Sequence, residues 1–256
     1  MKLPLLVLFL LVPTLFLRGE EKPSLRLLTY NIHAGIGVDQ KFDLERIAAV
    51  IKEVEPQVVA LQEVDKETKR SRGIDIAKEL SRLTGMKHVF GPAISIGGGE
   101  YGNALLTTLP IEGSDTIAIP REVDTEHRSL LSVDLRFHGE TIQILATHLC
   151  HQQQVNREAA AAFIATQIAP KERGSFLMGD LNALPDSEPL RRLMEAGWIL
   201  PPGKPAFTVP VDEPTRQIDY VLYRGAVGQA VTVKEVRVLE ERVASDHRAL
   251  LAVFEW

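Results

Sequence analysis

The feature that most constrains the fold is a succession of about a dozen short strand-like runs, interleaved with only four helix-like stretches. The strand-like runs cover residues 25–30, 58–61, 87–94, 103–108, 114–119, 129–137, 140–148, 175–178, 218–223, 231–238 and 249–254. Helical periodicity covers residues 43–53, 74–83, 154–168 and 188–196, and nothing repeats at the spacing of a solenoid. Many strands with few helices predict two packed sheets covered by helices.

Length and composition fit one globular domain. The chain has 256 residues, 45% of them hydrophobic, and its formal net charge is −5. No block of lysine or arginine provides a general nucleic-acid-binding surface. Cys150 is the single cysteine, so a metal would need oxygen and imidazole ligands, and hard oxygen ligands favour Mg²⁺, Mn²⁺ or Ca²⁺. The sequence around Cys150 does not predict a lowered thiol pKa, and we assign it no catalytic role.

The first residues form an apolar segment that predicts export. Leu3 to Leu17 is almost wholly apolar, follows Lys2 and ends at Arg18. A run of about 15 residues suits a signal peptide and is short of the roughly 20 residues that span a bilayer. We therefore predict a signal peptide over residues 1–19 and a periplasmic or secreted protein. An uncleaved membrane anchor is the alternative, because Leu17-Arg18-Gly19 lacks the small-x-small pattern of a cleavage site.

Polar side chains fall at the ends of most apolar strands. The residues in question are Asn31, Glu63, Asn103, His148, Asp180, Asn182, Asp219, Asp246 and His247. Singly, each has a structural explanation, such as a turn, a cap or a satisfied core histidine. A charged group at the end of a buried strand is costly unless it is paired or bound to metal. Their repetition predicts a functional site on the rims of the sheets.

The same positions lie within seven motifs spread over the chain. These are Thr29-Tyr30-Asn31-Ile32-His33, Leu61-Gln62-Glu63-Val64, Tyr101-Gly102-Asn103-Ala104-Leu105-Leu106, Thr147-His148-Leu149, Gly179-Asp180-Leu181-Asn182, Gln217-Ile218-Asp219-Tyr220 and Ser245-Asp246-His247-Arg248. In this order they resemble the endonuclease/exonuclease/phosphatase (DNase I-like) superfamily. The resemblance implies one such domain over residues 24–256. It also implies an α/β four-layer sandwich, in which two mainly antiparallel β-sheets pack face to face with helices on the outside.

The resemblance further implies a divalent-metal-dependent hydrolase of phosphoric esters. Glu63, Asn31 and Asp246 would be the metal ligands, because carboxylate and amide oxygens with waters suit Mg²⁺ or Mn²⁺. His247 resembles the catalytic histidine of the family, and Asp219 its partner. A carboxylate on one imidazole nitrogen fixes the tautomer and stabilises the charged ring.

Further residues would handle the attacking water and the phosphate. Asp180 and His247 are rival candidates for the general base, and the sequence leaves this choice open. Asn182 would hydrogen-bond a phosphoryl oxygen, and His148 and Asn103 would line the phosphate pocket. Arg128 is another candidate for a phosphate clamp, because a guanidinium matches phosphate oxygens; the alternative is a surface arginine.

The substrate is less constrained. The segments 62–65 and 68–71 resemble a branch similar to the catalytic domain of proteins that remodel glycosylphosphatidylinositol-anchored lipids. With the acidic charge, this favours a lipid or small-molecule phosphodiester or phosphomonoester outside the cytoplasm, with a monomeric enzyme and membrane-surface association. Alternatives are a secreted DNase I-like nuclease, a non-catalytic binding module of the same fold, and an enzyme with His148 and Cys150 as a nucleophile pair. A binding module should lack Glu63, Asp180 or His247, and this chain has all three.

Overall fold

The computed structural model describes residues 22–226 and 231–256, so the predicted segment 1–19 lies outside the described residues. The strands are β1 (Ser24–Asn31), β2 (Val58–Lys66), β3 (Lys87–Ile96), β4 (Gly99–Thr107), β5 (Ile111–Ala118), β6 (Ser129–Phe137), β7 (Glu140–His148), β8 (Ser175–Asp180), β9 (Asp219–Arg224), β10 (Thr232–Val238) and β11 (Leu250–Glu255). The helices are α1 (Leu44–Glu53), α2 (Ile76–Thr84), α3 (Gln154–Gln167), α4 (Glu188–Glu195) and the short 3-10 helix η1 (His33–Gly35). In the described part of the chain, no helix has the length and apolar character needed to cross a bilayer.

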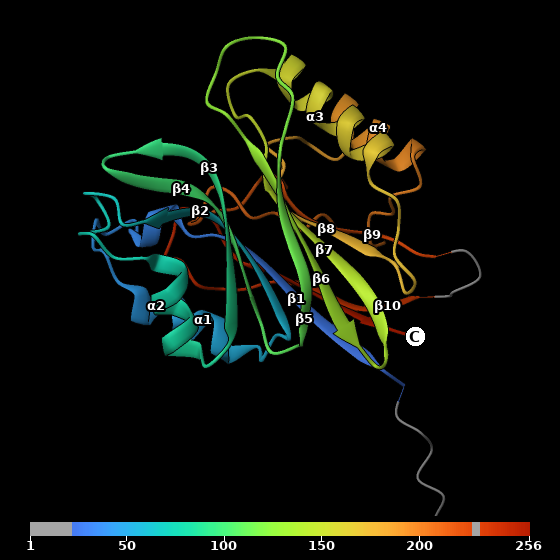
Figure 1. The fold of residues 1–256 in the computed structure, drawn as a ribbon, viewed down its shortest axis with the longest axis horizontal. Helices are drawn as coiled ribbons and strands as arrows, with labels where there is room; N and C mark the ends of the chain where they lie inside the picture. Colours follow the sequence, from blue (N-terminus) through green and yellow to red (C-terminus); the bar gives the residue numbers. More distant parts are fainter. Residues whose placement is uncertain (1–21, 227–230) are drawn as a thin grey trace, which may run out of the picture.

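The strands form two sheets that pack against each other. One sheet has the order β10-β11-β1-β2-β4-β3, and the other the order β5-β6-β7-β8-β9. Strands β1 and β2 of the first sheet contact β8, β9 and β7 of the second. Helices α1 and α2 cover the outer face of the first sheet, and α3 and α4 cover the second (Figure 1). All neighbouring strands are antiparallel except β1–β2 and β7–β8, so the predicted four-layer sandwich is confirmed.

Strand β1 illustrates how the layers are held together. Leu28 and Tyr30 point into the core beneath α1 and α2, whereas Leu25 and Leu27 point into the core between the sheets. Side chains of a strand alternate between its two faces, so a strand buried on both faces needs apolar residues at nearly every position. This explains why four of the six residues from Leu25 to Tyr30 are large and apolar, with Arg26 and Thr29 as the exceptions. A third core lies between the second sheet and α3 and α4.

Local signals set the ends of several elements. Asp43 and Asp75 accept hydrogen bonds from backbone N–H groups in the first turns of α1 and α2, at 2.9 Å and 3.0 Å. Gly85, in the left-handed conformation, ends α2. His138 and Gly139 both have positive φ and form the predicted hairpin turn between β6 and β7.

The two parallel strand pairs place the polar residues at one rim. In the pair β1–β2, Asn31 is in register with Gln62, and in the pair β7–β8, His148 is in register with Asp180. The carboxyl ends of parallel strands lie at the same edge of a sheet. Strand β9 then begins opposite the end of β8, which pairs Asp180 with Asp219. Residues distant in sequence are thus brought together where both sheets end.

Gly179 is required by the close approach of β7 to β8 just before this rim. Its φ is +146°, and a Cβ atom there would lie 1.9 Å from the carbonyl oxygen of Thr147. We expect Gly179→Ala to lower the unfolding free energy by about 3 kcal/mol or more, because the backbones of both strands must separate. Urea denaturation measures this. Gly113→Ala is the matched control, since a Cβ at that strand position meets no atom within 4 Å; an equal loss in both variants would contradict the explanation.

Candidate active site

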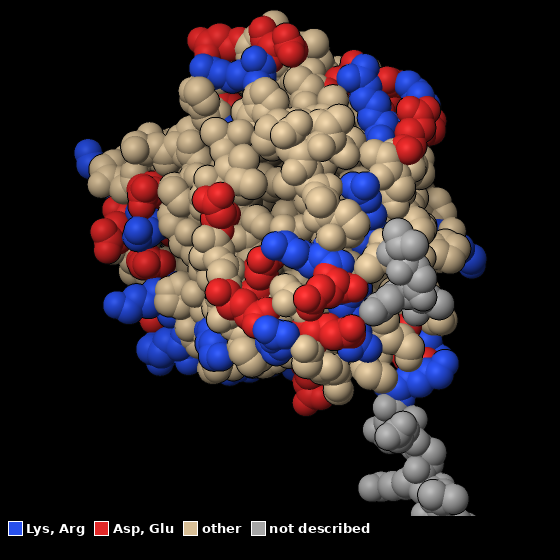
Figure 2. All heavy atoms as spheres, turned by 45° about the vertical axis from the view of Figure 1, so that its right-hand side comes forward, with Lys and Arg blue, Asp and Glu red and all other residues tan. Residues whose placement is uncertain are grey.

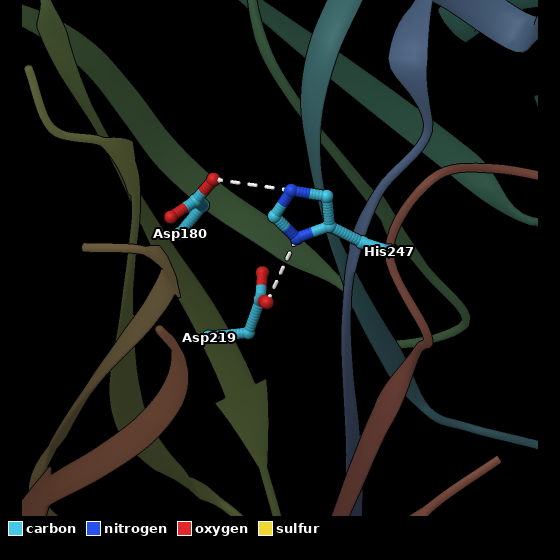
Figure 3. Close-up of side chains that lie close together, drawn as sticks. All are labelled: Asp180, Asp219 and His247. Atoms are coloured by element: carbon cyan, nitrogen blue, oxygen red, sulfur yellow. Dashed lines mark hydrogen bonds and ion pairs between the residues drawn. The ribbon is translucent and has the colours of Figure 1, made fainter. Parts of the chain in front are cut away.

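Three buried side chains form the centre of the site: Asp180, Asp219 and His247 (Figure 3). His247 lies between the two carboxylates. Its Nδ1 is 2.9 Å from Oδ2 of Asp219, and its Nε2 is 3.7 Å from Oδ2 of Asp180. The predicted pairing of His247 with Asp219 is therefore present in the structure.

The electrostatic surroundings keep His247 protonated. Burial disfavours the charged ring, but the charge and hydrogen bond of Asp219, with the charges of Asp180 and Asp246, outweigh burial and raise the pKa of His247 to about 10. A ring with protons on both nitrogens cannot ligate a metal or accept a proton. Asp180, Asp219 and His247 offer ligand atoms within 4.8 Å of one another, but Nδ1 of His247 is already bound to Asp219 at 2.9 Å, so we interpret the three as a hydrogen-bonded group.

Asp180 is the opposite case, a carboxyl group whose pKa lies near neutrality. Burial and the charge of Asp219 raise the pKa of Asp180 to about 7, although the charge of His247 and the hydrogen bonds from Asn182 and Asn31 act in the other direction. The backbone N–H of Asn182 donates to Oδ1 at 2.9 Å, and Nδ2 of Asn31 donates to Oδ2 at 3.2 Å. The carboxyl group is therefore fixed in position and titrates in the range useful to a general base.

Thr208 is a residue of the site that the sequence did not reveal. Its hydroxyl donates to Oδ2 of Asp219, the same oxygen that contacts His247. Thr208 is fully buried and lies in the proline-rich loop 201–214. It does not follow a strand or helix, so nothing in the sequence indicated that it belongs to the site. Through Thr208, the loop therefore holds the carboxylate of Asp219 in the orientation that contacts His247.

The predicted metal ligands lie beside this centre. Asn31 donates from Nδ2 to Oε1 of Glu63 at 3.1 Å, and its backbone carbonyl accepts from Oγ of Ser245 at 2.7 Å. The same Oγ lies 3.3 Å from Oδ1 of Asp246, which links the exposed Asp246 to the group. Glu63 has a φ of +59° at an irregularity in β2, a strained conformation of the kind that clusters at functional sites.

These residues fit a hard divalent cation. Glu63 contacts Asn31 directly and Asp246 is linked to Asn31 through Ser245, and Asp180 and Asp219 add two further acidic groups nearby. The charged His247 offsets only part of this negative charge. Carboxylate and amide oxygens are the donors that Mg²⁺ and Mn²⁺ prefer. The donor set thus agrees with the predicted cofactor.

An open polar pocket of about 350 Å³ exposes this centre to solvent. Its lining consists of Glu63, Tyr101, Glu126, Arg128, His148, His151, Asp180, Asn182 and His247. Arg128 is buried, so the alternative of a surface arginine is wrong. Tyr101, Glu126 and His151 were not predicted as site residues. Tyr101 stands beside the predicted Asn103 in sequence, which was a usable signal, whereas Glu126 and His151 belong to no motif.

Two predicted phosphate-contacting amides have partners within the protein. Asn182, with a φ of +48°, donates from Nδ2 to the carbonyl of Leu149 at 3.1 Å while lining the pocket. Asn103 is buried in β4 and donates to the carbonyl of Ser129 at 3.1 Å. Its Oδ1 has no hydrogen-bond partner among the described residues. Phosphate contact by either residue stays a prediction.

Comparisons with known proteins place the chain in a family. The model of the endonuclease/exonuclease/phosphatase family matches residues 28–247. The chain belongs to this family. YbhP, an uncharacterized protein of Escherichia coli strain K12, is 26% identical over 248 residues, which cover 90% of this chain and 95% of YbhP. The narrower resemblance to glycosylphosphatidylinositol-remodelling proteins stays a prediction.

Solved structures of the endonuclease/exonuclease/phosphatase fold superpose over nearly the whole described chain. A mannosyl-6-phosphatase of Bacteroides thetaiotaomicron has a TM-score of 0.73 at 15% identity and covers 91% of this chain and 100% of its own. TDP2 of D. rerio, complexed with a single-strand DNA product, has a TM-score of 0.73 at 18% identity and covers 91% and 99%. At these identities the likeness establishes the fold.

In this family member, Cys150 differs from the sequence expectation in one respect. Burial alone would raise the pKa of its thiol, but hydrogen bonds from the backbone of Gln153 and Gln152 and from Thr125 lower it. The sequence around Cys150 contained no sign of this lowered pKa. The sulfur contacts the backbone N–H of Gln153 at 3.4 Å and Thr125 at 3.7 Å, and the residue is not part of the pocket lining. These contacts do not pair it with His148 as a nucleophile.

Proposed function

We propose that this protein hydrolyses a phosphoric ester by direct attack of water, with Asp180 as the general base. The observation that carries the proposal is the geometry of two neighbouring groups: Nδ1 of His247 is bound to Asp219 at 2.9 Å, whereas the carboxylate of Asp180 is held by the N–H of Asn182 and lines the pocket. His247 is held as a cation by Asp219, whereas Asp180 has a pKa of about 7 and faces the same pocket. Neighbouring groups with pKa values driven apart are typical of acid–base sites. This favours Asp180 over His247 as the base.

The side chains divide the work of the reaction. Asp180 accepts a proton from the water as its oxygen forms the new bond to phosphorus, and the Asn182 N–H holds the carboxylate in place. The protonated Nε2 of His247 stabilises negative charge on the phosphoryl group, while Asp219 keeps the ring charged and oriented. The ester oxygen leaves as the bond to phosphorus breaks.

Glu63, Asn31 and Asp246 would hold the divalent cation, Mg²⁺ or Mn²⁺. Such a cation supplies charge neutralisation on the phosphoryl and leaving oxygens. We expect Glu63→Gln to raise the Mg²⁺ concentration for half-maximal activity about 10–100-fold, because the amide loses the charge that attracts the cation. Titration of chelator-treated enzyme with Mg²⁺ measures this. Glu112→Gln, at an exposed position in β5, is the control; an unchanged requirement in Glu63→Gln would contradict the assignment.

We propose an extracytoplasmic lipid or small-molecule phosphoester as the substrate. The pocket is compact, with Arg128 as its one arginine or lysine among the described lining residues. Figure 2 shows blue and red side chains interspersed on the face turned forward, with a wide tan area between them and no continuous basic stripe. A non-specific nuclease would need such a stripe, and the sequence likewise contains no block of lysine or arginine. Among proteins of similar fold, one is named a mannosyl-6-phosphatase and another binds a DNA product, so monoesters and DNA both belong in the test.

We also propose that the protein is exported and monomeric. Whether residues 1–19 are removed affects which substrate it can reach. Strand β1 runs eight residues from Ser24 to Asn31, roughly 23 Å, so Ser24 lies at the opposite end of the strand from Asn31 and the pocket. If residues 1–19 stay as an anchor, this arrangement favours a soluble substrate. If they are removed, association of the free enzyme with a membrane surface becomes compatible with a lipid substrate. Sequencing the N-terminus of the recovered protein distinguishes the two, and a cytosolic protein starting at Met1 would exclude export.

A substrate panel tests the activity itself. The protein, with Mg²⁺ or Mn²⁺, is given bis-p-nitrophenyl phosphate, p-nitrophenyl phosphate, sphingomyelin, phosphatidylinositol, plasmid DNA and RNA. We expect metal-dependent turnover of the small esters or lipids and weak or no turnover of nucleic acid. Preferred cleavage of DNA would support the nuclease alternative. No turnover of any ester with metal bound would support the non-catalytic binding module.

A further inference from the structure

Arg128 makes an unusual set of contacts for a buried arginine. One nitrogen, Nη1, lies 3.1 Å from Nδ1 of His148 and 3.0 Å from Oε1 of Glu126. The other, Nη2, lies 3.3 Å from Nδ1 of His151. The guanidinium thus bridges His148, the last residue of β7, and His151 on the connection that follows, and Glu126 supplies the opposite charge.

The chemistry of these contacts determines where the histidine protons lie. A guanidinium donates hydrogen bonds and accepts none, so Nδ1 of each ring must be the acceptor. A ring that accepts at Nδ1 is neutral and carries its proton on Nε2. We propose that Arg128 is a positioning residue, which holds His148 and His151 as neutral rings with the proton on Nε2. This inference rests on the proposed hydrolase function for its catalytic consequence, but the tautomers themselves do not depend on it.

The consequence is a second N–H donor aimed at the general base. Nε2 of His148 lies 3.5 Å from Oδ2 of Asp180, and Nε2 of His247 lies 3.7 Å from the same oxygen. With the proton on Nε2, His148 presents a donor to this carboxylate and to a water or phosphoryl oxygen beside it. With the proton on Nδ1, a lone pair would face the carboxylate and Nδ1–H would face the guanidinium, and both arrangements are repulsive.

The imidazole rings of His148 and His151 differ in solvent exposure, and we assign them different roles on this basis. His148 is buried, and burial together with the charge of Arg128 holds its pKa well below the ordinary value, in agreement with a neutral ring. His151 is exposed at the edge of the same pocket, beside Glu126. We assign the Nε2–H of His148 to the reacting centre. The Nε2–H of His151 is then available to the part of the substrate that extends beyond the phosphate.

The tautomers can be observed directly in the full chain. Long-range ¹H–¹⁵N correlation spectra distinguish protonated from unprotonated ring nitrogens, and the chain has seven histidines to assign. His148→Gln and His151→Gln identify the two signals. We expect both rings to be neutral, with the proton on Nε2, at pH 7.5. A proton on Nδ1 of His148, or a charged His148 ring, would overturn the proposal whatever the enzyme hydrolyses.

Substitution of Arg128 tests its positioning role. In Arg128→Lys the charge remains, but an ammonium is a point donor and cannot bridge both rings. We expect the tautomer populations to become mixed and kcat to fall about 10²-fold, the effect of losing one positioned donor, with KM changed far less. A higher KM with unchanged kcat and unchanged tautomers would identify Arg128 as a phosphate clamp only and overturn the proposal.

The matched control is Arg136→Lys at the far end of β6, where the guanidinium contacts Glu112 and the carbonyl of Gly139. It should leave both the spectra and kcat unchanged. If no substrate is turned over by the unmodified protein, the proposed function fails while the ring spectra still decide this inference.

Discussion

Asp180→Asn is expected to lower kcat by about 10³-fold or more without loss of the native fold. General base catalysis contributes about 10²–10⁴-fold, and asparagine cannot accept the proton of the attacking water. Its side-chain oxygen can still accept the backbone N–H of Asn182, which now donates to Oδ1 at 2.9 Å. Steady-state kinetics on the best substrate of the panel, with circular dichroism to verify folding, measures the effect.

Asp186→Asn is the matched control for this substitution. Asp186 is an exposed aspartate six residues along the chain and is not part of the pocket lining. It should retain full activity. If Asp180→Asn kept more than a tenth of the activity, the general base would have to be sought elsewhere.

The same substitution should alter how stability depends on pH. The pKa of Asp180 is raised from 3.8 to about 7 in the folded state, so its contribution to stability is fully present below pH 3.8 and is lost as the pH rises through 7. This loss with rising pH is absent in Asp180→Asn. The unfolding free energy of the variant minus that of the unmodified protein should therefore be more positive at pH 8 than at pH 5. Urea unfolding at the two pH values measures the difference, and an equal difference at both would show that Asp180 is not perturbed.

The fold and the centre of the site could be predicted from the sequence for a common physical reason. A charged residue directly after an apolar strand has to be paired or solvated, and this chain repeats that pattern at several strand ends. The parallel pairs β1–β2 and β7–β8 place these ends at the same rim. Strand patterns therefore indicated both the two sheets and the location of the site. They did not indicate which helix pair covers which sheet, because this depends on packing between distant segments.

The features that escaped prediction depend on contacts between loops. Thr208 reaches Asp219 from a proline-rich loop, and its type and neighbours resemble those of any turn residue. Arg128 could be read as a surface arginine, because its burial depends on His148, His151 and Glu126 closing around it. The lowered pKa of Cys150 likewise depends on hydrogen bonds from the following turn. The hydrophobic periodicity of the sequence predicts strands and helices but does not predict contacts between loops.

Asp219→Asn should cause the second large loss, about 10³–10⁴-fold in kcat. Its carboxylate is the largest favourable influence on the charged form of His247 and hydrogen-bonds Nδ1 at 2.9 Å. Removing the carboxylate partner of a catalytic histidine in a serine protease costs about 10⁴-fold, because the ring loses its tautomer and charge. Here the loss is expected because His247 no longer presents a stable N–H to the phosphoryl group. Asp115→Asn, at an exposed position in β5, is the control and should be silent.

A structural role for Asp219 would also reduce activity, so stability has to be measured as a function of pH. The pKa of His247 is raised from 6.5 to about 10 in the folded protein, so its stabilising contribution is fully present below pH 6.5 and is lost as the pH rises through 10. Asp219→Asn removes most of that contribution. Its deficit in unfolding free energy should therefore be largest near pH 6 and shrink towards pH 10. A deficit independent of pH would mean that Asp219 supports the fold through Thr208 and not the charge of His247.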